Sequence, residues 1–116
     1  MIRLTQDWPR LAWMISADFK NSLTEGAPPL IFAATLRALW WDARGNWSQA
    51  HAEVDELETV QGMAVHAYLH RKEGKQPNAA YWYGKAGRPF PLVSLAEEWE
   101  ILLDELLSAT TDPRVV

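Results

Sequence analysis

Three histidines and a glutamate have the spacing of a metal or ligand site. His66 and His70 are four residues apart, and Glu73 follows three residues after His70. On an α-helix this spacing places two imidazoles and a carboxylate on one face, where they can bind a single metal ion. His51, one predicted helix earlier, could supply a further ligand if its helix faces the other three residues.

The same residues also have a structural interpretation. The zinc-protease motif needs a glutamate directly after its first histidine, and Ala67 occupies that position here. Buried histidines are commonly hydrogen-bonded to tyrosine or to the backbone, and the next predicted helix carries tyrosines. We therefore expect packed histidines, with no metal and no cofactor. The alternative hypothesis is a small-molecule or metal-dependent site formed by His51, His66, His70, Glu73 and Tyr81.

A stretch of basic residues is the second candidate for chemistry. Between residues 71 and 88 the chain carries five lysines and arginines against one acid, whereas acidic segments lie on either side. Arginine presents a planar fork to carboxylates, and a neighbouring aromatic ring can stack on it. The pattern predicts a surface that binds an acidic protein or peptide, formed by Tyr68, Arg71, Lys72, Lys75, Tyr81 and Arg88. The alternative is that these charges only pair with the flanking acids and stabilise helix C-termini.

The composition narrows the other function classes. The chain has 116 residues, a formal net charge of −4 and no cysteine, so nothing favours a nucleic-acid partner, a disulfide or a cysteine zinc site. No apolar run approaches the roughly 18 residues of a membrane span, and Asp7 and Pro9 interrupt any export signal. We expect a cytoplasmic protein without a membrane partner. Nucleophile, phosphate-loop and dinucleotide motifs are absent, which makes an enzyme the minority interpretation.

Almost every periodic stretch of the chain has helical spacing, and there is no convincing alternation of period two. We expect one all-α domain over residues 1–116. Helices are predicted at about 8–23, 29–44, 48–59, 60–73, 78–86 and 95–108. Gly45 should end the second helix in a left-handed conformation, and Gly74 should end the fourth. Ser94 and Glu97 predict a capping box at the start of the last helix.

A weak internal duplication organises these helices. The segment from Gly45 to Ala50 aligns with the segment from Gly74 to Ala79, at an offset of 29 residues. In each copy a helix ends at glycine, and a small alanine follows that lets two helices approach closely. Both turns resemble the junction of tetratricopeptide repeats of the Sel1-like kind, although that family repeats every 34 residues. The resemblance implies two antiparallel helical hairpins, at about 29–59 and 60–88, between capping helices at about 8–23 and 95–108.

About half of the chain also looks like a family of small microbial helical proteins without an assigned activity. The matching segments are Leu36–Trp41, Gly45–Trp47, Ala50–His51, His66–Gly74, Ala80–Tyr83 and Gly87–Pro89. This resemblance implies a helical fold and carries no function. In tetratricopeptide repeats the first helices line a concave groove, so the leading hypothesis is a module that binds a protein or peptide.

Overall fold

The computed structural model describes residues 16–111, and within this range every regular element is a helix. The elements are α2 (Ser16–Asn21), the 3-10 helix η2 (Ser22–Thr24), α3 (Ala34–Ala43), α4 (Trp47–Val54), α5 (Val60–Lys72), α6 (Gln76–Lys85) and α7 (Leu95–Thr111). The predicted all-α fold class is therefore confirmed. The predicted start of the first helix, near residue 8, lies outside the described residues. In the described range no helix has the length and apolar character needed to cross a membrane.

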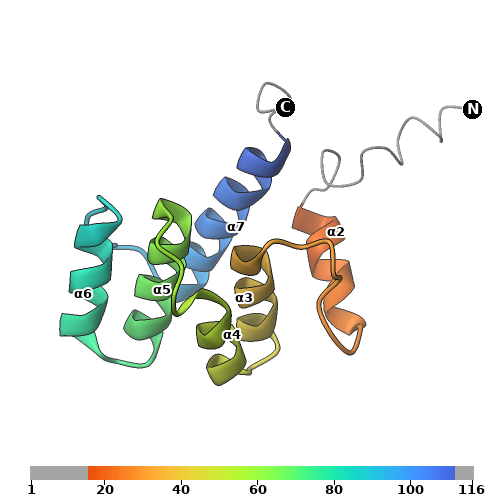
Figure 1. The fold of residues 1–116 in the computed structure, drawn as a ribbon, viewed down its shortest axis with the longest axis horizontal. Helices are drawn as coiled ribbons and strands as arrows, with labels where there is room; N and C mark the ends of the chain where they lie inside the picture. Colours follow the sequence, from red (N-terminus) through yellow and green to blue (C-terminus); the bar gives the residue numbers. More distant parts are fainter. Residues whose placement is uncertain (1–15, 112–116) are drawn as a thin grey trace, which may run out of the picture.

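The helices pack as two successive pairs with a further helix across them. α3 packs against α4 and α5 against α6, and the short turns inside each pair make the two helices antiparallel. Figure 1 shows α6, α5, α4 and α3 in a row, with α2 beside α3. α7 contacts both α3 and α5, so it covers the two pairs at once. This arrangement agrees with the expected hairpins and places α4 directly against α5, where the histidines lie.

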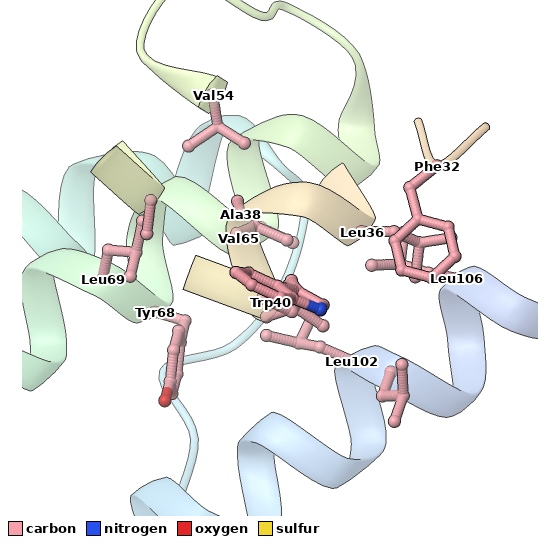
Figure 2. Packing of buried hydrophobic residues seen from close by; sticks show 14 of the residues in the cluster. Phe32, Leu36, Ala38, Trp40, Val54, Val65, Tyr68, Leu69, Leu102 and Leu106 are labelled. Carbon is pink, nitrogen blue, oxygen red and sulfur yellow. The ribbon is translucent and has the colours of Figure 1, made fainter. Parts of the chain in front are cut away.

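The core forms where α3, α5 and α7 meet, because each of these helices turns large apolar side chains toward the others. Trp40 of α3 is completely buried, and its indole nitrogen lies 3.1 Å from the Ser22 hydroxyl oxygen. Leu69 of α5 and Leu102 of α7 belong to the same cluster (Figure 2). α5 is buried at every position from Gly62 to Leu69, which makes it the central helix of the domain.

Local sequence signals account for most helix ends. Gly45 and Gly74 have positive φ angles of 79° and 87°, as expected for glycines that follow a helix. The Ser94 hydroxyl accepts a hydrogen bond from the Glu97 amide at 3.0 Å, and the Glu97 carboxylate accepts one from the Ser94 amide at 3.1 Å. The predicted capping box is therefore confirmed.

Several predicted boundaries are wrong. The helix predicted from residue 29 begins at Ala34, because Phe32 turns back and stacks on Phe19 with 5.3 Å between ring centroids. The helix predicted to residue 59 ends at Val54, because Thr59 already caps α5 by accepting a bond from the Gly62 amide. The two hairpins therefore span residues 34–54 and 60–85.

Candidate functional site

All three histidines of the chain converge at the contact between α4 and α5. His51 lies in α4, while His66 and His70 lie one turn apart on the same face of α5. The Nε2 atoms of His51 and His66 are 3.0 Å apart, and one ring nitrogen from each histidine lies within 4.8 Å of the others. The packing of the two hairpins thus joins residues that are up to 19 positions apart in the sequence.

Two tryptophans enclose this cluster. The Trp47 ring stacks on His51 with 4.8 Å between centroids and 11° between planes. The Trp82 ring, from α6, stacks on His66 with 4.2 Å and 21°. The Trp47 indole nitrogen donates a 2.8 Å hydrogen bond to the Leu69 carbonyl, which holds the ring in place. The imidazoles of His51 and His66 are therefore each stacked on a tryptophan ring.

The cluster is closed at His66 and open at the other two histidines. His66 is 2% exposed, whereas the side chains of His51 and His70 are 24% and 12% exposed. The Nδ1 atom of His66 is buried without a hydrogen-bond partner among the described residues, which is rare for a buried polar atom. Nδ1 of His70 lies 2.6 Å from a carboxylate oxygen of Glu73. Solvent can therefore reach the cluster along the side of His51 and His70.

Burial keeps the innermost histidine neutral. Loss of solvation, together with the neighbouring His51 and His70, lowers the pKa of His66 to about 4. A neutral imidazole retains a lone pair on one nitrogen, and this is the form that binds metal ions. At neutral pH, His66 is therefore prepared to act as a ligand.

The geometry agrees with a three-histidine metal site. With Zn–N bonds of about 2.0–2.1 Å, neighbouring ligand nitrogens of a tetrahedral site lie about 3.3 Å apart. The 3.0 Å between His51 and His66 is close to that value. The third nitrogen, from His70, lies within 4.8 Å of the other two and would have to move closer for all three to bind one ion. The set could hold Zn²⁺, Ni²⁺ or Cu²⁺ and leave a position for a solvent-side ligand.

The sequence-based expectation that His66 and His70 bond to tyrosine or backbone is wrong. Their polar contacts are to His51 of α4 and to Glu73, because α6 turns Trp82 rather than a tyrosine toward His66. Tyr81, included in the alternative cluster, is 59% exposed and packs edge-on against Trp82. The structure thus gathers four of the five residues of that cluster and leaves Tyr81 outside.

Most of the basic stretch pairs within the molecule. Arg71 donates to Glu98 at 2.7 Å and to the Val93 carbonyl at 2.5 Å, and Arg88 donates to Glu105 at 2.9 Å. These acids belong to α7, so pairing with a flanking acidic segment occurs for both arginines.

Two more of the six predicted partner-binding residues, Tyr68 and Lys72, are hydrogen-bonded to Asp42 of α3. Lys72 donates to the Asp42 carboxylate at 2.8 Å, and the Tyr68 hydroxyl donates to it at 2.7 Å. Tyr68 is 2% exposed and cannot meet a partner at the surface. Lys75 and Tyr81 remain exposed.

The two tryptophans were not singled out from the sequence as parts of the site. Trp47 precedes His51 by four residues, a spacing that places both side chains on one helix face and could have indicated the contact. No comparable signal exists for Trp82, since its stacking on His66 depends on how α6 packs on α5.

Comparison with known proteins adds no assignment, because no protein-family model matches the chain and no curated protein or solved structure is significantly similar to it.

Proposed function

We propose that this protein binds one divalent transition-metal ion through His51, His66 and His70. The observation that carries the proposal is the convergence of one ring nitrogen from each histidine within 4.8 Å. The chain has only three histidines, and all of them lie in this cluster. This proposal replaces the sequence-based expectation of a site without metal.

The ligand set selects the class of ion. Three neutral imidazoles suit Zn²⁺, Ni²⁺ and Cu²⁺, whereas Mg²⁺ and Ca²⁺ prefer oxygen ligands. Glu73 contacts His70 in the way that an outer carboxylate commonly supports a metal-binding histidine. Protons compete with metal ions for imidazole nitrogens, so affinity should fall at low pH.

The consequence of binding follows from where the ligands lie. His51 belongs to the first hairpin, while His66 and His70 belong to the second, so one ion would connect the two hairpins. A ligand that binds only the folded state stabilises it by about 4 kcal/mol at 1,000 times its dissociation constant. Metal should therefore raise the stability of the whole domain.

The test is calorimetric titration of tag-free, chelator-treated protein with Zn²⁺ and Ni²⁺. We expect one ion per chain at micromolar concentration and a change in tryptophan fluorescence, because Trp47 and Trp82 stack on two of the ligands. His51→Gln and His70→Gln should each weaken binding at least about tenfold.

Gln61→Ala is the matched control, since Gln61 is exposed on the same helix as His70 and is absent from the cluster. It should bind metal as the parent does. Absence of binding by the parent, or equal binding by the parent and both histidine variants, would contradict the proposal.

The protein- or peptide-binding module with an acidic partner stays a separate proposal that rests on the sequence. Of its residues, Lys75 and Tyr81 are exposed and Lys72 is exposed but paired with Asp42, and Lys85 lies 5.7 Å from the Tyr81 ring. A cytoplasmic setting and a relation to tetratricopeptide repeats are likewise proposals from the sequence.

A further inference from the structure

The connection between α6 and α7 exposes an apolar surface around a hollow. Leu92 is 100% exposed and Ile101 is 42% exposed, and both line a hollow of about 270 Å³ together with Pro91 and Val93. We call this surface the Leu92 patch. Its hollow is smaller than the roughly 300–1,000 Å³ of typical small-molecule sites, so it suits a side-chain anchor of a peptide better than a free ligand.

The segment that carries Leu92 is held in place by contacts on both sides. Phe90 packs edge-on against Tyr83 with 5.1 Å between ring centroids. Arg71 donates to the Val93 carbonyl, and Arg88 pairs with Glu105 of α7. Leu92 is therefore displayed by an anchored segment, and a partner that meets it does not first have to order the loop.

The charge around the patch is negative and unbalanced. Glu97 and Asp104 are exposed on α7 at four residues before and three residues after Ile101, which places all three on one face. Neither acid forms an ion pair with any of the described residues. The nearby cations are already used, because Arg71 pairs with Glu98 and Arg88 with Glu105.

We propose that the Leu92 patch docks a positively charged amphipathic peptide or protein segment, which places an aliphatic side chain in the hollow and its cations against Glu97 and Asp104. The exposed acids beside the patch favour a positively charged partner over a second copy of this acidic chain. A two-fold symmetric dimer would bring two acidic faces of α7 together and would be repelled. This partner is opposite in charge to the acidic partner proposed for the basic stretch, and it would meet a different surface.

The probe is a labelled 18-residue helical peptide with leucine at helical spacing and lysine elsewhere, and its counterpart has glutamate in place of lysine. Fluorescence anisotropy is measured with chelator present, so that the result is independent of the metal site. We expect the lysine peptide to bind with an affinity that falls with salt, and the glutamate peptide not to bind.

Matched leucine variants distinguish the patch from general attraction to an acidic protein. Leu92→Asn should weaken binding about tenfold, whereas Leu30→Asn, at a leucine that is 97% exposed elsewhere, should not. Glu97→Gln, which keeps the capping box, and Asp104→Asn should both weaken binding and reduce its salt dependence.

Equal binding by the two leucine variants would overturn the proposal. Dimers in sedimentation equilibrium that Leu92→Asn disperses would overturn it as well, because the occupant would then be a second copy.

Discussion

Gly62, in the first turn of α5, is a position where replacement of glycine by alanine should destabilise a helix. Its amide donates to the Thr59 hydroxyl at 3.0 Å, which caps α5. A Cβ atom built at Gly62 would lie 2.7 Å from the Leu57 Cβ and 2.9 Å from the Thr59 hydroxyl oxygen. Because the Leu57 Cβ is attached directly to the backbone, the chain between α4 and α5 would have to move.

The expected magnitude follows from the opposing terms. Alanine is favoured over glycine inside a helix by about 1 kcal/mol. Overpacking against Leu57 costs about 1–3 kcal/mol, and disturbance of the Thr59 cap costs about 1 kcal/mol more. Gly62→Ala should therefore lower the free energy of unfolding by about 1–3 kcal/mol. Gly84 is the control, since it lies in α6 with no atom within 4 Å of its added Cβ, and Gly84→Ala should stabilise by about 0.5–1 kcal/mol.

Urea unfolding followed by circular dichroism in chelator would measure both changes. With a urea dependence of about 1–3 kcal/mol per molar, the two midpoints should move in opposite directions, by about 0.3 M or more for Gly62→Ala and about 0.2 M or more for Gly84→Ala. If Gly62→Ala is as stable as the parent while Gly84→Ala is stabilised, the contact between Leu57 and the start of α5 is refuted.

Three further predictions concern the histidine cluster and the hairpin packing. Without metal, the free energy of unfolding should fall by up to about 3 kcal/mol as pH drops from about 6.5 to 4. The reason is that His66 takes up a proton in the unfolded state at a higher pH than in the folded state. Urea unfolding of the parent and of His66→Gln at several pH values would check this. Glu73→Gln should weaken metal binding about 10–100-fold in calorimetry, since His70 loses its carboxylate partner. Ala79→Leu should cost about 1–3 kcal/mol in urea unfolding, because Ala79 is completely buried in α6; a variant that unfolds like the parent would show that the crossing has room.

The helix ends that could be predicted are the ones that depend on neighbouring residues. Gly45 and Gly74 end their helices with positive φ, and Ser94 with Glu97 caps α7, because these signals act over a few residues. The start of α3 was mispredicted for the opposite reason. Residues 29–33 leave the helix because Phe32 packs on Phe19, a contact between separate elements that helical periodicity does not contain.

In the candidate site, too, one part follows from local spacing and the other from the packing of the helices. The spacing of His66 and His70 determined by itself that they share a helix face, because both lie on one α-helix. Whether that face meets a tyrosine, the backbone or a third imidazole depends on how α4 and α6 are rotated and placed against α5. In the tertiary structure this face meets His51 of α4, and Trp82 of α6 also stacks on His66.

For the basic stretch, too, the sequence could predict the positions of the charges but not their ion pairs. The sequence by itself determined where the charges lie along the chain and that acids flank them. It did not determine which cations stay free, because Arg71 reaches Glu98 only when α7 crosses α5. Charges interact through space, so the packing of α7 on the hairpins decided which of the basic residues are paired.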